Sequence, residues 1–530
     1  MFRAPFLAVA ASLLPLLAAQ DEAAPAPPKA DAVLLRMRGT RAVFVRMRDQ
    51  LFPDAAAYPA FCAEHATTPR STLRAQTLKD LKHRADTSFA AVHDTVSKLS
   101  DSGDIHDLQR FWIINGFACD ADAAAVKTLC ALDAVAFVHL QTQPGQPQNH
   151  HRARDEEWIE ARRKDQEHAL KRIDARGEEA AFDVEAAEVP WNLERIRAHE
   201  AWKLGALGQG VVVAVLDTGI VPAPALLDAL WRNPEEKPDG KDDDGNGYVD
   251  DLFGWDFLGE TPYVVGDGDK SHGSMCSGIN AGRPLPTMHT VTGVAPRARL
   301  MVMRGTDSLR AYEYAASMGA DVMSLSYMWI EQELGSYRGV FRTAHEHLAA
   351  CGVVAVGGAG NFGISSPEGH QIAIPKDIPC VIAAAGIEKD GKAPRASSRG
   401  PCTWNDVPFF LDYPPEHPLE KPDVTGCFGG FPVWHWTSFP GQRRIEVAYD
   451  GGDGTGLIVG PRGNSFSGPH AAGVAALMLS ANHELTPWRV KELMERSCED
   501  LGESGRDRVY GAGLLRADAA VVAAREAKIE

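Results

Sequence analysis

Five short runs of small and branched apolar residues in the second part of the chain constrain its fold more than any other feature. Helix-like stretches separate these runs, which lie at 211–216, 299–303, 321–326, 353–356 and 381–385. A strand that is apolar at nearly every position is covered on both faces, as in a parallel sheet held between helices. The sequence therefore predicts a three-layer α/β/α domain with a mainly parallel sheet over 188–525.

A smaller unit is predicted before this domain, over 32–142. Strand-like and helix-like segments alternate within it, at 42–47, 73–99, 111–117, 120–132 and 134–140. The strand-like segments are rich in Val, Phe and Ile, and the last helical segment begins with acidic residues, which are typical of a helix start. This order predicts a small α+β domain.

The segment between the two units, 143–187, has a different composition. It begins polar and rich in turn residues, and from Arg152 it is dense in both charge signs with few apolar positions. We interpret it as a charged linker or a solvated helix, with a partner-binding helix as the alternative.

The first nineteen residues are typical of a secretory signal. Arg3 precedes an apolar stretch over 6–17, and Ala18 and Ala19 offer small residues for cleavage. A buried N-terminal helix is the alternative, but the acidic, Pro/Ala-rich segment 21–30 favours an exported chain. No later stretch reaches the roughly 18 apolar residues of a membrane span. We therefore expect a protein that is extracellular or periplasmic and free of the membrane once the signal is removed.

Composition narrows the classes of function. The chain has 530 residues, of which 45% are hydrophobic and 24% charged, as in globular proteins. Its formal net charge of −17 argues against a general nucleic-acid-binding protein, because such proteins are usually basic.

Three segments carry candidate chemistry. Asp217 ends an apolar strand and is followed by Thr218 and Gly219. An aspartic peptidase also uses Asp-Thr-Gly, but that reading usually requires a second such motif, which this chain lacks. His272 precedes a run of small residues, and Ser465 lies in a glycine-rich turn that opens an apolar helix. The helix dipole there favours developing negative charge.

Together these segments resemble the subtilisin family of serine endopeptidases. The chain order Asp217, His272, Ser465 is that of the family. Further similar segments are Val354-Ala355-Val356-Gly357-Gly358-Ala359-Gly360-Asn361, Gly293-Val294-Ala295-Pro296, Lys421-Pro422-Asp423-Val424 and Tyr510-Gly511-Ala512-Gly513. The resemblance covers about 189–523.

The resemblance implies a role for each site residue. Ser465 is the expected nucleophile, and His272 its general base and later the acid for the leaving amine. Asp217 is expected to hold the imidazole tautomer. Asn361 and the backbone N–H of Ser465 are expected to stabilise the tetrahedral oxyanion.

Substrate contacts are implied for Ser326, Tyr327, Met328 and Gly358. Met328 stands where the family usually has Gly, which predicts a narrowed pocket, and we expect a broad preference for apolar side chains. Two other departures surround the nucleophile, where Asn464 replaces a usual Thr and Phe466-Ser467 replaces Met-Ala.

An acidic loop predicts a structural calcium ion. Carboxylate and amide residues alternate around glycines over 242–251, and the expected ligands are Asp242, Asp244, Asn246 and Asp250. Phe253 stands where an EF-hand loop has Glu. A solvated acidic turn is the alternative.

The unit at 32–142 resembles the propeptide of the same family, a ferredoxin-like inhibitor and folding chaperone. The resemblance implies a zymogen whose cleft is blocked by its own propeptide until cleavage between about Gly177 and Glu188. The expected partners are protein or peptide substrates and this propeptide.

Two other functions compete with a peptidase. An α/β-hydrolase esterase requires G-x-S-x-G and the order Ser, Asp, His, whereas Ser467 replaces the second Gly here and both partners precede Ser465. A catalytically inactive binding or scaffold protein would be favoured by a lost triad residue, and none is lost.

Overall fold

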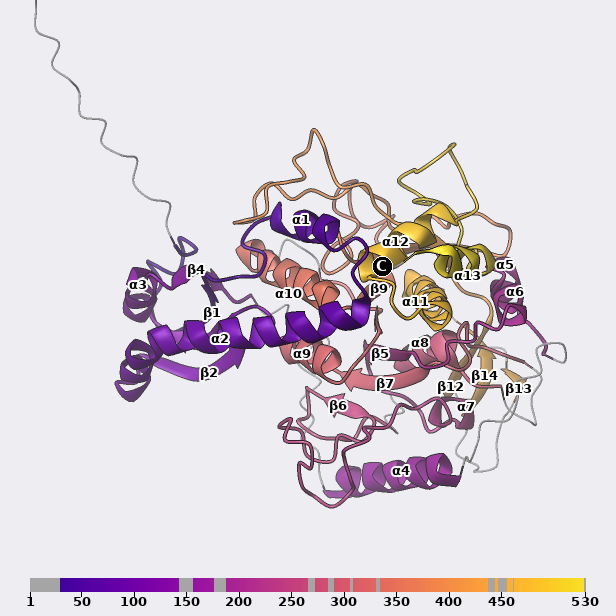
Figure 1. Ribbon diagram of the computed structural model, residues 1–530, viewed down its shortest axis with the longest axis horizontal. Coiled ribbons are helices and arrows are strands. Elements are labelled where there is room, and N and C mark those ends of the chain that lie inside the picture. The colour runs from indigo at the N-terminus through magenta and orange to yellow at the C-terminus, as the bar shows by residue number, and fades with distance from the viewer. Residues whose placement is uncertain are drawn as a thin grey trace, which may run out of the picture.

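The computed structural model describes residues 29–142, 156–175, 187–265, 272–284, 290–305, 308–329, 334–436, 444–446, 455–460 and 462–528. The predicted signal at 1–19 and the expected cleavage segment up to residue 186 lie outside these residues. In Figure 1 most of the N-terminal unit, in indigo and violet, lies to the left of the larger domain. The first residues of its longest helix, Arg70 and Arg74, bond to the larger domain.

A seven-stranded sheet forms the centre of the larger domain. Its strands run in the order β11 (Val424–Cys427), β10 (Ile382–Ile387), β9 (Val354–Gly358), β8 (Val322–Leu325), β5 (Val212–Asp217), β7 (Arg299–Arg304) and β6 (Gly254–Asp256). Every adjacent pair is parallel. All five apolar runs in the sequence form strands of this sheet, because each is buried on both faces.

Helices cover both faces of the sheet, which confirms the predicted three-layer α/β/α fold. One apolar cluster joins the sheet to α8 (His272–Ala281), α11 (Asn464–Ala481) and α13 (Ala517–Glu526). A second cluster joins the other face to α9 (Leu309–Ser317) and α10 (Arg338–Ala350). The layer that contains α8 and α11 supplies two of the predicted triad residues.

The N-terminal unit is a four-stranded antiparallel sheet with helices, as predicted. The strand order is β2 (Ile105–Phe111), β3 (Gly116–Ala121), β1 (Arg41–Met47) and β4 (Val135–Leu140). Its helices are α1 (Ala57–Glu64), α2 (Arg70–Asp101) and α3 (Ala123–Ala131). This βαββαβ order with the strands ordered 2-3-1-4 is the ferredoxin-like arrangement.

One predicted strand in this unit was wrong. The segment 111–117 contains the turn between β2 and β3 instead of a continuous strand. Ile113 and Ile114 in this turn are fully buried in the apolar cluster that contains α9 and α10. The segment is apolar because it packs against the larger domain, and not because it lies inside a sheet.

Two further elements lie on the larger domain. Helix α4 (Glu156–Ala175), in the charged segment, buries Ala169 and Ile173 in the first apolar cluster. Its Arg172 pairs with Asp228 through two hydrogen bonds of 2.6 and 2.7 Å. A small antiparallel sheet of β12 (Pro432–Trp436), β13 (Arg444–Glu446) and β14 (Thr455–Val459) precedes α11.

No helix among the described residues has both the length and the apolar character needed to cross a membrane.

Candidate active site

The three predicted triad residues are placed by three elements that pack together. Asp217 is the last residue of β5, His272 the first of α8 and Ser465 the second of α11. Both helices belong to the apolar cluster on one face of the sheet. A parallel sheet gathers functional side chains at the carboxyl ends of its strands, and Asp217 lies at such an end.

Asp217 and His272 form a close pair. Nδ1 of His272 lies 2.9 Å from each carboxylate oxygen of Asp217. The Asp217 carboxylate is buried and also accepts a 2.8 Å hydrogen bond from the backbone N–H of Thr218. Since Nδ1 faces the carboxylate, a neutral imidazole in this pair carries its proton on Nδ1 and leaves Nε2 as the basic nitrogen.

The electrostatics of the pair match this geometry. Burial lowers the pKa of the His272 imidazole, but the charge and hydrogen bond of Asp217, together with Cys276, more than offset burial and raise that pKa well above its ordinary value. Burial likewise raises the pKa of Asp217, and the charge and hydrogen bond of His272 more than offset it, so that pKa falls below its ordinary value. The carboxylate therefore stays ionised and stabilises an imidazolium.

Side chains from three elements surround the Ser465 turn. The Ser326 hydroxyl donates a 2.8 Å hydrogen bond to the Ser465 carbonyl oxygen. Sγ of Cys276 lies 3.5 Å from that oxygen and 3.8 Å from His272 Nδ1. The Phe466 ring is buried, with its centroid 6.0 Å from that of His272. These contacts fix both the serine turn and the imidazole.

The Ser465 hydroxyl and His272 Nε2 are not joined by a hydrogen bond among the described residues. In serine hydrolases this bond often forms or shortens only when substrate binds, so its absence does not exclude the pair.

Asn361 lies directly beside the start of α11. Its Oδ1 accepts a 2.8 Å hydrogen bond from the backbone N–H of Asn464. Nδ2 of Asn464 donates to the Gly360 carbonyl at 2.7 Å, so the turn after β9 and the turn before α11 hold each other in place. A side chain at Gly463 would come within 3.2 Å of Asn361 Nδ2. Glycine at this position leaves the Asn361 amide room to donate a hydrogen bond.

The predicted substrate-binding residues divide into two that lie against the glycine-rich turns, Gly358 and Met328, and two whose hydroxyl groups bond to other parts of the protein, Ser326 and Tyr327. A Cβ at Gly358 would lie 1.8 Å from the Asn464 carbonyl oxygen, so only glycine allows β9 to approach the nucleophile turn. Met328 lies against Gly360, whose added Cβ would meet the methionine at 2.9 Å. Ser326 instead binds the serine turn. Tyr327 directs its hydroxyl to that of Tyr312 at 2.6 Å.

The predicted calcium ligands are not all brought together. Asp242 accepts backbone hydrogen bonds from Asn246 and Gly247 at 3.0 and 2.8 Å, and Asp250 accepts from Asp239 and Gly240, both at 3.0 Å. These two carboxylates shape the loop from within.

The carboxylates that gather are Glu236, Asp244 and Asp251, which each offer an oxygen within 4.8 Å of the others. Glu236 and Asp251 are buried, and burial raises both pKa values, that of Asp251 to about 6. Nδ2 of Asn246 lies 3.0 Å from both Asp244 and Asp251. Three converging oxygen donors with reduced access to water fit a hard divalent cation such as Ca²⁺.

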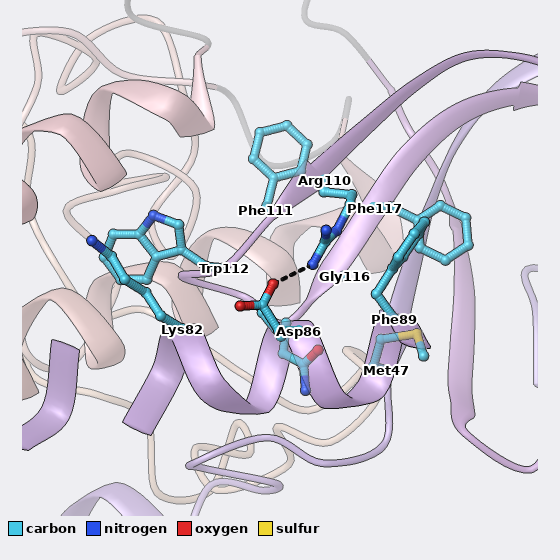
Figure 2. Close-up of a pocket in the computed structure, with 11 residues that line it drawn as sticks. Met47, Lys82, Asp86, Phe89, Arg110, Phe111, Trp112, Gly116 and Phe117 are labelled. Carbon is cyan, nitrogen blue, oxygen red and sulfur yellow. Dashed lines mark hydrogen bonds and ion pairs between the residues drawn. The ribbon is translucent and has the colours of Figure 1, made fainter. Parts of the chain in front are cut away.

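A pocket elsewhere in the molecule lies in the N-terminal unit, between α2 and the β2–β3 hairpin (Figure 2). Arg110 crosses it to pair with Asp86 at 2.7 Å, and the Lys82 ammonium lies 5.4 Å from the ring centroid of Trp112. No triad residue lines this pocket. Its charged groups are already paired, and it is separate from the candidate active site.

Several residues of the site were not identified from the sequence. Glu236 and Asp251 flank the predicted calcium ligands, and the acidic character of the whole stretch was the available signal. Asn464 and Phe466 were noted only as departures from the family. Their positions next to the nucleophile indicated a supporting role, but only the structure shows which groups they contact.

Comparisons with known proteins identify the family of the chain. The profile of the Subtilase family of peptidases matches residues 208–513. Bacillopeptidase F of Bacillus subtilis (strain 168) is 25% identical over 482 residues, which are 85% of this chain and 29% of that protein. The calcium-dependent protease of Nostoc sp. (strain PCC 7120 / SAG 25.82 / UTEX 2576) is 26% identical, over 63% of this chain and 50% of that protein.

Among solved structures, MycP1 with its N-terminal propeptide removed is similar, with a TM-score of 0.41 and 26% identity. The match covers 63% of this chain and 98% of that one. The chain thus spans half or less of the length of the two curated relatives above. Since the family profile covers more than half of the sequence, the chain belongs to the subtilase family.

Proposed function

We propose that this protein is a secreted serine endopeptidase that hydrolyses peptide bonds through an acyl-enzyme, with Ser465 as nucleophile. The observation that carries this proposal is the pair of 2.9 Å contacts from His272 Nδ1 to Asp217, at the starting end of the helix that bears Ser465. Membership of the subtilase family supports the same chemistry.

Each group has a defined task in this mechanism. Nε2 of His272 accepts the Ser465 proton as Oγ attacks the scissile carbonyl, and the buried Asp217 carboxylate stabilises the resulting imidazolium. The Asn361 amide and the Ser465 backbone N–H donate to the oxyanion at the start of α11. The imidazolium then protonates the leaving amine, and water hydrolyses the acyl-enzyme by the same steps in reverse order.

The N-terminal unit is proposed to act as an intramolecular inhibitor and chaperone. Arg70 donates a 2.6 Å bond to Asp321, and both side chains are only 8% exposed. The backbone N–H groups of Trp112 and Ile113 donate to the half-buried Glu313 carboxylate on α9. A buried ion pair across an interface fixes its geometry, because either charge left alone there is strongly unfavourable. These contacts support a unit that stays docked on the larger domain, and we propose that the active site of the same chain cleaves it off.

Hydrolysis of casein by the purified full chain tests the function. A serine-directed organophosphonate should stop the hydrolysis, and mass spectrometry should place one adduct on Ser465. Denatured protein treated in the same way is the control, since the modification requires the assembled site. A native protein that neither cleaves casein nor takes up the reagent would instead favour an inactive scaffold.

We also propose that Glu236, Asp244 and Asp251 hold a structural calcium ion. When bound, the ion supplies positive charge that offsets the repulsion among these carboxylates. The relative named as a calcium-dependent protease supports the proposal.

Removal of calcium should lower the thermal unfolding midpoint. An ion present at a hundred times its dissociation constant stabilises the folded state by about 2.7 kcal/mol, which corresponds to a shift of roughly 5 °C. Scanning calorimetry with calcium and with a chelator measures the shift. Asp251→Asn should abolish it, whereas Asp242→Asn, which changes a carboxylate outside the cluster, should keep it. A midpoint that does not respond to calcium in the unmodified protein would contradict the site.

A further inference from the structure

A buried lysine beside the candidate active site makes no hydrogen bond among the described residues. Lys376 follows Pro375 in the connection between β9 and β10, and its side chain is 1% exposed. Its Nζ has no hydrogen-bond partner among the described residues. An ammonium group is almost never buried without a counter-charge, because the loss of hydration is costly.

The position of Lys376 relates it to substrate. Its Nζ lies 4.8 Å from the centroid of the Tyr327 ring, just beyond β8. On β9, a Cβ at Gly357 would come within 2.3 Å of Lys376 Cε and 3.2 Å of Nζ, so the glycine makes space for the lysine.

The same two segments hold the residues implied in substrate binding. Gly358, which follows Gly357 at the end of β9, approaches the Ser465 turn. The backbone N–H of Trp329 binds the Ile374 carbonyl at 2.8 Å, which ties the Tyr327 segment to the Lys376 segment. The ammonium therefore lies between the two strand ends that flank the nucleophile.

A second buried lysine shows how this fold satisfies such a group when its role is structural. Nζ of Lys421 donates to the Val381 carbonyl and to Asp423, both at 2.6 Å. Lys376 has no equivalent bonds: Nζ of Lys376 and Oδ1 of the neighbouring Asp377 both lack a hydrogen-bond partner among the described residues, so the two groups are not bonded to each other. Oδ2 of Asp377 accepts two hydrogen bonds from Arg338, at 2.9 and 2.6 Å.

We propose that Lys376 is the charged floor of the pocket for the residue whose carbonyl is attacked, and that this pocket selects glutamate or aspartate. This deepens the proposed peptidase function and rests on it. A substrate carboxylate would give the ammonium the charged hydrogen-bond partner that it lacks in the free protein. This selectivity would replace the broad preference for apolar side chains that the sequence analysis expects.

The state of the free lysine fits this role. Burial lowers the pKa of Lys376 to about 7, and the nearby Asp377 and Asp217 offset part of that effect. A bound carboxylate would raise the pKa again and hold the proton on Nζ.

The sequence of the expected processing segment has the matching chemistry. Residues 177–188 contain five acidic side chains, Glu178, Glu179, Asp183, Glu185 and Glu188, and no basic one. A pocket with a buried ammonium would accept this segment of its own chain.

Three matched peptides test the proposal on the full chain. They differ only in having Glu, Gln or Leu before the scissile bond, and kcat/KM is measured for each. Unmodified protein should prefer Glu to Gln by about 10- to 100-fold, as expected for a hydrogen bond between charged groups. Lys376→Met, which has similar length without charge, should bring this ratio close to one. Lys389→Met, at an exposed lysine, should leave it unchanged.

A measurement on the unmodified protein keeps the test valid if Lys376→Met does not fold. Mass spectrometry of the self-processed chain should show a new N-terminus that follows Glu or Asp. Preference for Leu over Glu, a Glu-to-Gln ratio near one, or a ratio that persists in Lys376→Met would overturn the selectivity but leave the peptidase function intact. Failure to cleave any of the peptides or casein would overturn the proposed function itself.

Discussion

Replacement of Ser465 by alanine should lower casein hydrolysis by about 10⁶-fold and leave the N-terminal unit attached. The magnitude is the one that loss of the nucleophile costs in subtilisin, where the remaining groups still provide weak catalysis. Alanine removes only the hydroxyl, which makes no hydrogen bond in the described part of the chain. The serine turn should persist, because it is held through the Ser465 carbonyl by Ser326 and Cys276. Rates from concentrated enzyme and the intact mass of each chain measure both effects.

The control for this experiment is Ser504→Ala, which removes an exposed hydroxyl far along the chain from the site. It should hydrolyse casein and process itself as the unmodified protein does. Circular dichroism and the unfolding midpoint should be alike in the unmodified protein and Ser504→Ala, and circular dichroism should show that the unprocessed Ser465→Ala chain is folded. A Ser465→Ala protein within tenfold of the unmodified rate would show that another group is the nucleophile.

The central sheet was predictable because its cause is local. The runs that became β5, β7, β8, β9 and β10 are apolar at almost every position, and only a strand between two layers of helices satisfies that pattern. The same logic failed for 111–117. Ile113 and Ile114 are as apolar as a buried strand, but another unit of the molecule covers them. Periodicity reports burial and does not identify the covering surface.

In the candidate site, too, short motifs identify some residues, whereas others can be found only from the three-dimensional arrangement. Asp217 and His272 could be named from short motifs, and the structure brings them into contact. Glu236 and Asp251 lie outside the residues chosen from the acidic stretch, since spacing does not show which carboxylates turn inward and which cap backbone N–H groups. Lys376 was not identified, because a lysine in a loop is usually solvated. Only its burial beside Tyr327 distinguishes it.

Replacement of Asp217 by asparagine should lower kcat by about 10⁴-fold while the fold is preserved. The amide has the shape of the carboxylate, but it cannot stabilise the imidazolium. Its NH₂ group can also donate to Nδ1, which places the imidazole proton on Nε2 and removes the base that Ser465 needs. Asp390→Asn, at an exposed position, controls for the loss of one negative charge. A rate within tenfold of the unmodified protein would contradict the role assigned to Asp217.

The pH profile of the residual activity separates this role from a merely structural one. The base must be neutral, so activity appears as the pH rises through the pKa of His272. Asp217 raises that pKa well above its ordinary value, whereas burial alone lowers it. In Asp217→Asn the lowering effect of burial and the contribution of Cys276 remain, but the largest raising effect is lost, so the acidic limb of kcat/KM should move to lower pH. A limb that stays at the same pH would mean that Asp217 does not interact with the ionising base, whatever the loss in rate. A shift to lower pH together with the loss in kcat is the result that only a carboxylate paired with the catalytic imidazole predicts.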